Sequence, residues 1–354
     1  MIIESIALIA LAFGLIVFFH EAGHFLAARA TGMTVHEFSI GFGRPLLFWF
    51  KRGQTQYSFR LWPFLSYVRI AGMEDGEDDP NGFGRKSRPA QAFVLVMGCL
   101  MNFILAIGIY IVMGSVVGLP VPNTRIQEVM PKTAAARVGL KSGDKLVGVD
   151  TRTGLSVDQI REAIQAHPGK PLDLKVERGG AVETIPITPM TQQGYELHGI
   201  HIRTVPIGVI GVRFSYTSEH ASIGKSVRLG FQQTVSMIQL QVAGIIGMVG
   251  RKVPADVMGP VGVVTTMYDE ARAGMLEFLS TFAAITIAIG FLNLLPIPPL
   301  DGSRLVIVGL EAIRRKPFNK EKENLVHLIG LALFLALVVV LTYRDILRII
   351  TGKP

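Results

Sequence analysis

The sequence predicts a polytopic α-helical membrane protein with about four transmembrane helices, a β-hairpin in its first loop and an inserted α+β domain. The first observation is composition, because 49% of the residues are hydrophobic, only 18% are charged and the mean hydropathy is +0.43. Such a chain is apolar for a soluble protein. The second observation is a set of four apolar stretches, each near the ~20 residues that a bilayer requires. The third is a more polar segment between the second and third stretches.

We place the four spans at residues 3–28, 91–118, 275–297 and 325–347. Lysine and arginine are concentrated in the loop between the first two spans and in the loop between the last two. The positive-inside rule therefore places both loops in the cytoplasm and both termini outside. The first span lacks the basic leader of a signal peptide and carries Glu4, so we expect it to be retained.

An HExxH pattern, His20-Glu21-Ala22-Gly23-His24, lies inside the first span. On a helix, His20 and His24 fall one turn apart on one face, so they can share a zinc ion while Glu21 acts on water. A histidine on an apolar helix is more often a packed core residue than a ligand. Ionisable residues are nevertheless costly within a membrane span, which favours a metal site here.

A catalytic zinc needs a third protein ligand, and the neighbourhood of His24 supplies none. The next acidic residues are Glu37 and then Glu74, and no HExxHxxGxxH continuation exists. Asp301 is the candidate, because it follows the apolar stretch 282–295 and a proline-rich run that ends the helix at membrane depth.

The first loop contains two segments with the alternation typical of strands, residues 57–62 and 65–70, which flank Pro63-Phe64. We predict that these two strands pair with each other as a hairpin.

Residues 121–204 mix charged residues with short alternating apolar runs, such as 172–177, and are expected to form a globular insert with a helix near 156–166. Residues 229–249 are fairly apolar but are interrupted by four glutamines, so we predict an amphipathic helix on the membrane surface. A fifth crossing would separate Asp301 from the histidines by far more than a zinc bond of ~2 Å. The expected domains are an N-terminal membrane core, the insert, an interfacial helical segment and a C-terminal membrane core, at 1–120, 121–204, 205–274 and 275–354.

Several patterns together resemble the site-2 proteases, which are intramembrane zinc metalloproteases, and in particular the bacterial RseP type with a single PDZ unit. They are HEAGH in the first span, MGCLMNF at 97–103, a PDZ-like stretch at 136–150, MGPVGV at 258–263 and NLLPIPPLDG at 293–302. Two departures from the family pattern are Gly98-Cys99, where the second span of the family has Gly-Pro, and Ala288, where some members have asparagine.

The resemblance implies that His20, His24 and Asp301 hold Zn²⁺ and that Glu21 is the general base. It implies that Asn293 lies near the substrate. Asn102 can do the same, although we favour a packing role in which its amide bonds across helices.

The resemblance also implies that the hairpin is membrane-associated and lies beside the zinc, where an unwound substrate can pair with Tyr67 and Val68 as an extra strand. Substrates would be single-span proteins such as anti-sigma factors or signal-peptide remnants, cleaved toward the cytoplasmic side of a bacterial plasma (inner) membrane. The PDZ-like insert would be extracytoplasmic. PDZ domains hold a peptide carboxylate on backbone amides, for which Leu197, Gly199 and Ile200 are the candidate loop. A module that only excludes bulky substrates is the alternative.

Two other classes of function stay open. One is a zinc-dependent membrane transporter or sensor, which should show inverted repeats that this sequence lacks. The other is an inactive relative that binds clients through its PDZ-like module, although the intact Glu21 argues against it. The net charge of +8 is assigned to loops near lipid headgroups, and nucleic-acid binding is not expected, because no basic cluster interleaves with aromatic residues.

Overall fold

The computed structural model forms two compact units. We call them the helical unit (Met1–Met113, Ile223–Ile238 and Asp256–Pro354) and the insert (Gly114–Ser222 and Gln239–Ala255). The structure describes residues 2–62, 66–73, 79–198, 201–251, 257–316 and 318–351.

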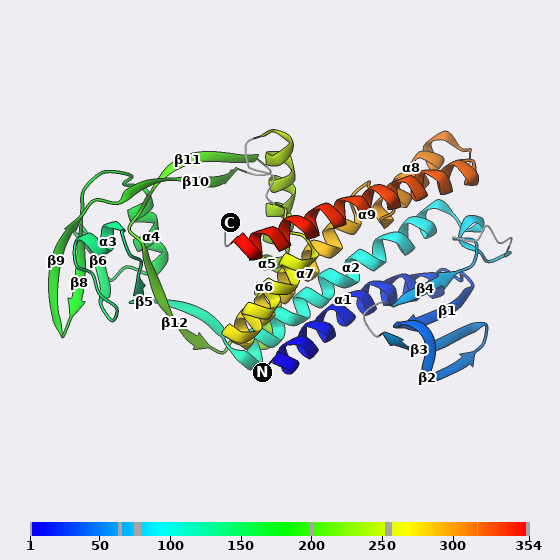
Figure 1. The fold of residues 1–354 in the computed structure, drawn as a ribbon, viewed down its shortest axis with the longest axis horizontal. Coiled ribbons are helices and arrows are strands. Elements are labelled where there is room, and N and C mark those ends of the chain that lie inside the picture. The colour runs from blue at the N-terminus through cyan, green and yellow to red at the C-terminus, as the bar shows by residue number, and fades with distance from the viewer. Residues whose placement is uncertain are drawn as a thin grey trace. The chain divides into compact units, whose positions relative to one another are not determined.

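Within the described residues, four helices of the helical unit are long and apolar enough to cross a membrane. Figure 1 shows where they lie in the fold. They are α1 (Ile2–Ala30), α2 (Arg88–Val112), which continues as a short π-helix (Met113–Val117), α7 (Met275–Asn293) and α9 (Lys320–Thr351). The prediction of four spans is therefore confirmed by length and composition. Helix α5 (Ile223–Val249) is not among these four candidates, as expected for the glutamine-interrupted segment.

Glycines allow the spans to approach one another closely. A Cβ atom at Gly23 of α1 would collide with the Met97 carbonyl of α2, and one at Gly290 of α7 would lie 3.1 Å from the Asn102 Cβ. Small residues set helix packing in this way where lipid, rather than water, surrounds the bundle. Two shorter helices complete the unit: α6 (Pro260–Ala273) contacts α1, α7 and α9, and α8 (Asp301–Arg314) contacts α2.

A four-stranded sheet follows α1 in the order β2-β3-β1-β4. Its strands are β1 (Val35–Ile40), β2 (Phe42–Arg52), β3 (Thr55–Trp62) and β4 (Tyr67–Ile70), and a 3-10 turn (Phe83–Arg85) precedes α2. The predicted strands β3 and β4 exist, but the prediction that they pair as a hairpin was wrong. Strand β1 lies between them, parallel to β3 and antiparallel to β4, and β3 forms its hairpin with β2.

Buried polar contacts explain why β1 takes the central place. Ser58 on β3 donates a hydrogen bond of 2.8 Å to Glu37 on β1, and Arg60 pairs with the same carboxylate at 2.6 Å. Burial acts to raise the pKa of Glu37, but the hydrogen bonds from Arg60 and Ser58 outweigh it and hold that pKa below its usual range. Glu37 is thus a carboxylate at neutral pH and bridges two strands that an apolar pattern alone does not join.

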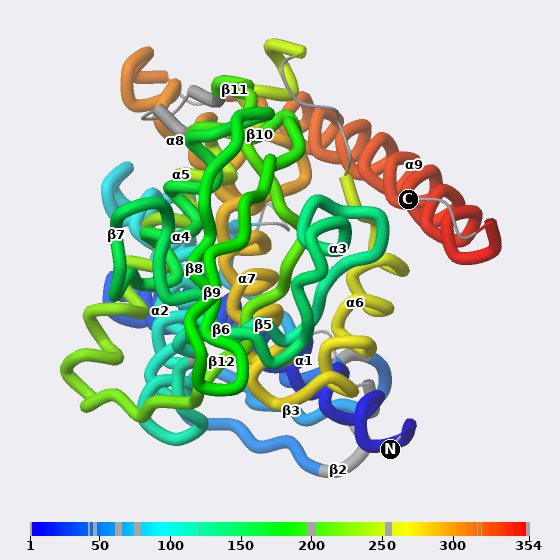
Figure 2. Tube along the Cα trace, turned by 90° about the vertical axis from the view of Figure 1, so that its left-hand side faces the viewer, coloured from blue at the N-terminus to red at the C-terminus, as the bar shows by residue number. Residues whose placement is uncertain are grey.

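The insert is built on a sheet in the order β12-β5-β6-β8-β9, with β7 paired to β6 (Figure 2). The strands are β5 (Leu119–Val129), β6 (Lys145–Val149), β7 (Arg152–Thr153), β8 (Leu172–Arg178), β9 (Ala181–Ile187) and β12 (Val212–Glu219). Helices α3 (Ala134–Arg137) and α4 (Val157–Gln165) contribute to one apolar core with Leu146, Ile160 and Leu174. The expected helix near 156–166 is therefore present, and Ser156 and Gln159 close its first turn as a capping box.

The insert is longer than expected. It runs to Ser222 instead of residue 204, because two further strands occupy part of the segment expected to be helical. Strands β10 (Met190–His198) and β11 (His201–Val209) form a separate antiparallel hairpin, and β12 returns to pair with β5.

Candidate metal centre

The C-terminal half of α1 positions three of the expected site residues. His24 is buried, and its Nδ1 atom lies 2.8 Å from the carbonyl oxygen of Val94 on α2. A carbonyl can only accept, so Nδ1 carries the proton and Nε2 is left with a free lone pair. Helix α2 can pass this close because residue 98 is glycine: a Cβ there would collide with the His24 ring. The packing of α1 on α2 thus selects the tautomer that a metal requires.

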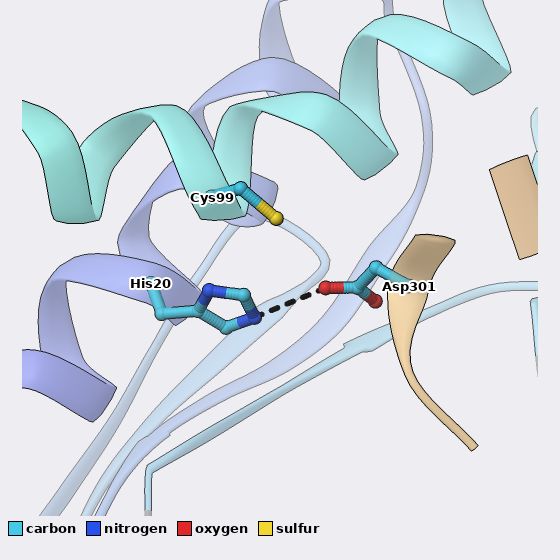
Figure 3. Close-up of side chains that lie close together, drawn as sticks. All are labelled: His20, Cys99 and Asp301. Carbon is cyan, nitrogen blue, oxygen red and sulfur yellow. Dashed lines mark ion pairs between the residues drawn. The ribbon is translucent and has the colours of Figure 1, made fainter. Parts of the chain in front are cut away.

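Asp301 reaches the histidines from the other end of the chain. It opens α8, after α7 has ended at Asn293, and Gly302 lets that first turn lie against the carbonyls of Leu294 and Leu295. The Asp301 Oδ2 atom lies 3.1 Å from His20 Nε2 and 3.2 Å from His24 Nε2. Figure 3 shows the His20 ring and the Asp301 carboxylate pointing toward one another below α2.

The three donor atoms fit a zinc ion. The two histidine Nε2 atoms are themselves 3.2 Å apart, so all three donor–donor distances are 3.1 or 3.2 Å. A tetrahedral zinc with bonds of ~2.0–2.1 Å requires edges of about 3.3 Å between its ligands. Two imidazoles and one carboxylate also form a donor set typical of catalytic zinc, with one position left for water.

Glu21 lies on α1 between the two histidines and is held by the sheet. Its Oε2 atom accepts a hydrogen bond of 2.9 Å from the backbone amide of Val68 on β4. Strand β4 is at the edge of the sheet, and the amide that reaches Glu21 is not used in the pairing of β4 with β1. The sequence-predicted Val68 is therefore next to the predicted base, through its backbone.

Comparison with known proteins agrees with this geometry. A family model described as Peptidase family M50 matches residues 8–337. The chain belongs to this family. The predicted resemblance and the predicted metalloprotease class are thereby confirmed for this M50 peptidase.

Relatives cover nearly the whole M50 chain. The zinc metalloprotease RasP of Geobacillus kaustophilus is 30% identical in an alignment that covers 97% of this chain and 98% of the relative. The regulator of sigma-W protease RasP of Bacillus subtilis is 27% identical and covers 99% of this chain and 100% of the relative. A protein of Agrobacterium fabrum, also named as a zinc metalloprotease, is 32% identical over 96% of this chain and 95% of its own length. These names agree with the expectation of zinc as cofactor.

The two asparagines of this M50 peptidase differ in their surroundings. Asn293 is half-buried at the last position of α7. Asn102 is fully buried on α2, and neither its Nδ2 nor its Oδ1 atom has a hydrogen-bond partner among the described residues. The cross-helix hydrogen bond expected of Asn102 is therefore not formed within the described part of the chain. A buried amide without a partner is costly in free energy, so this position differs from an ordinary packed residue.

Sequence reasoning missed the second-span contributions to the site. Cys99 places its Sγ atom within 4.8 Å of donor atoms of His20 and Asp301 (Figure 3). Gly98 and Val94 act on His24 as described above. The sequence does mark these positions, because Gly98-Cys99 departs from the family pattern. A pattern does not show, however, which face of the helix lies toward the histidines.

The candidate carboxylate loop of the insert falls at the turn of the β10–β11 hairpin and stays a prediction. Leu197 pairs with Ile202 near the end of the β10–β11 hairpin, while Gly199 and Ile200 fall outside the described residues. Strand β11 contacts α4, and a Cβ at Gly208 would meet the Ile164 carbonyl there. Six residues separate Gly208 from Ile202, or about 20 Å of strand. The contact of β11 with α4 thus lies toward the C-terminal end of β11, away from the pairing of Leu197 with Ile202.

Proposed function

We propose that this M50 peptidase is an intramembrane zinc metalloprotease that hydrolyses peptide bonds within the transmembrane segments of single-span proteins. The observation that carries the proposal is the convergence of His20, His24 and Asp301 to within 3.1–3.2 Å of one another. They converge beside Glu21. The helix that carries Glu21 and both histidines is apolar and long enough to span a membrane. We assign His20, His24 and Asp301 as zinc ligands and Glu21 as the general base.

The residues of the site divide the chemistry between them. When bound by the two histidines and Asp301, zinc polarises the scissile carbonyl and makes water more acidic. The Val68 amide fixes Glu21 Oε2, so that the carboxylate is oriented before the substrate arrives. Glu21 takes a proton from the attacking water and later delivers it to the leaving amine nitrogen.

The edge strand β4 suggests how a substrate is presented. A transmembrane helix protects its own peptide bonds by internal hydrogen bonds, so it must unwind before hydrolysis. We propose that the unwound segment pairs along β4, next to Tyr67 and Val68, and that the amides of Asn293 and Asn102 bind freed backbone groups. The unpartnered amide of Asn102 supports this use over pure packing.

For the biological context, the proposal follows the relative whose name describes a regulator of sigma-W protease. We propose that the substrates are anti-sigma factors already shortened on the outside, or remnant signal peptides. The protein would lie in the bacterial plasma membrane with both termini and the insert outside. The insert, with its α4 helix beside β11, would act as a PDZ-like module that binds peptides or excludes bulky proteins.

The decisive experiment compares wild type with Glu21→Gln on a tagged single-span substrate in detergent and in liposomes, with zinc measured in both proteins. Glutamine keeps the shape and an oxygen for the Val68 amide but cannot accept the proton. We expect zinc to be retained and cleavage to fall by about 10²–10⁴-fold. Glu4→Gln makes the same change at an exposed position on the same helix and should have no effect. Cleavage by Glu21→Gln at the wild-type rate would refute the base, and absence of zinc from wild type would refute the site.

A further inference from the structure

A buried carboxylate in the last span has no part in the chemistry above. Asp345 lies on α9, and only 3% of its surface is exposed. Its Oδ1 atom accepts a hydrogen bond of 3.2 Å from the Gly259 amide, and its Oδ2 atom accepts one of 2.7 Å from the Gly262 amide. An ionisable residue in a span is costly to keep and is usually functional.

The partners of Asp345 form the start of α6, within the MGPVGV pattern. Gly259 is the N-cap of α6 and has no side chain to cap the helix, while Pro260 has no N–H to offer. Asp345 therefore caps α6 from another helix, with the carboxylate at the positive end of the helix dipole.

The two glycines are required by this arrangement. A Cβ at Gly259 would lie 2.6 Å from Asp345 Oδ2 and 2.8 Å from the Cβ of Leu341, and a Cβ at Gly262 would lie 3.1 Å from Asp345 Oδ2. A serine or aspartate at 259, which caps most helices, would thus push α9 away. The glycine-proline-glycine spacing therefore leaves room for the Asp345 carboxylate and directs two backbone amides toward it.

Helix α9 also contacts the segment that carries the third metal ligand. Gly330 lies against Pro298, three residues before Asp301, and a Cβ at Gly330 would collide with Pro298. Helix α6, which Asp345 caps, contacts α1, the helix of both histidines. Helix α9 is therefore linked to α1 through α6 and to the aspartate segment through Pro298.

We infer that Asp345 is a positioning residue of the metal centre: it fixes α9 on α6 and thereby holds the Asp301 segment against the histidines of α1. The inference rests on the proposed zinc site. Asp345 acts without touching the metal or the substrate, so its effect should be on how firmly zinc is held and on turnover, with little effect on substrate binding.

The test uses the purified full-length protein loaded with zinc. Zinc release to a chelator is timed for wild type and for Asp345→Ala, Asp345→Asn and Asp345→Glu, and kcat and KM are measured on the same samples. We expect Asp345→Ala to release zinc at least tenfold faster and to lose kcat with KM unchanged. Asp345→Asn keeps one acceptor oxygen, so its rate of zinc release should lie between those of wild type and Asp345→Ala. Asp345→Glu should retain zinc nearly as well as wild type. Val339→Ala, at an exposed site of α9, is the matched control.

The outcomes separate the inference from the function on which it rests. If wild type holds no zinc, the proposed function fails. If wild type holds zinc and Asp345→Ala releases it at the wild-type rate, only the positioning role is overturned, even where thermal stability has fallen. If Asp345→Ala does not fold, Gly330→Ala disturbs the other contact of α9 and must accelerate zinc release. Unchanged release in Gly330→Ala then overturns the inference.

Discussion

The helical unit and the insert both bury apolar side chains, but the helical unit buries many more polar ones. The core of the insert is apolar, with Leu146, Ile160 and Leu174 fully buried. The helical unit encloses polar groups, while α9 exposes apolar side chains along most of its length. The buried polar side chains of the helical unit include His24, Gln91, Asn102, Glu311 and Asp345. The exposed apolar side chains of α9 include Leu325, Leu333, Val339 and Ile350.

The difference follows from the solvent of each unit. In water, apolar burial drives folding, so the interior of the insert should be the source of its stability. In lipid, apolar burial gains little, and close backbone contacts and satisfied polar groups hold helices together. Asp345, for example, joins α9 to α6 by accepting hydrogen bonds from the Gly259 and Gly262 amides. In the helical unit, the most damaging substitutions should therefore be those that add atoms where two helices approach closely. In the insert, they should be those that remove apolar atoms and leave a cavity.

The largest effect should come from Gly98→Ala in the helical unit. The added methyl group would collide with the ring of His24, which we propose as a zinc ligand, and would displace it. We expect zinc content and cleavage both to fall by about 100-fold or more, the scale of losing about 3 kcal/mol. Gly108→Ala makes the same change on the same helix where nothing lies within 4 Å, and it should behave as wild type. Equal zinc content in the two variants would contradict the comparison.

A smaller effect, confined to the insert, should follow from Leu174→Ala. Removing a fully buried leucine leaves a cavity that typically costs about 2–5 kcal/mol. Hydrogen exchange of β6 and β8 amides in the full-length protein should show this loss, while the zinc content stays at the wild-type value. Val182→Ala on β9, at an exposed position, serves as control. A loss of zinc in Leu174→Ala would show that the two units do not respond separately.

The smallest effect should come from Arg178→Gln, and it should depend on pH. Arg178 donates two hydrogen bonds, of 2.8 and 2.7 Å, to the buried Asp144 carboxylate. These bonds, helped by the Lys141 amide, hold the pKa of Asp144 below its usual range. The variant should lose about 1–2 kcal/mol of insert stability at neutral pH.

The sign of the pH dependence follows from the lowered pKa. The contribution of the pair is complete above the unfolded pKa of ~3.9 and disappears as the pH falls through the folded pKa. Hydrogen exchange at pH 7 and at about pH 2, well below the unfolded pKa, should therefore show a smaller difference between wild type and Arg178→Gln in acid. Arg213→Gln breaks the exposed pair with Glu128 and should cost less than ~0.5 kcal/mol at either pH. A difference for Arg178→Gln that grows in acid would contradict the assignment.

The sequence predicted features that depend on local pattern. Apolar length predicted the four spans, the i and i+4 spacing placed His20 and His24 together, and the proline-rich run led to Asp301. Features that depend on contacts between distant segments were missed. Strand β1 enters between β3 and β4 through the carboxylate of Glu37, and no alternation of apolar residues shows this.

The MGPVGV pattern shows the same limit from the other side. Its glycines are part of the family resemblance, but the sequence does not show why glycine is needed there. The Gly262 amide donates a hydrogen bond to the Asp345 carboxylate, which is 83 residues away in the chain. Spacing along a chain cannot report which segments meet in space.

The strands by which the chain enters and leaves the insert lie side by side. Leu119 at the start of β5 is opposite Glu219 at the end of β12, and the Ser218 hydroxyl donates to the Val117 carbonyl. The continuous part of the insert, Gly114–Ser222, thus begins and ends at neighbouring points, like a module inserted into a loop. Its removal and replacement by a short turn between residues 118 and 220 should leave a protein of helices and one sheet that still binds zinc. Such a minimal chain would be a practical starting point for engineering proteases with exchangeable recognition modules.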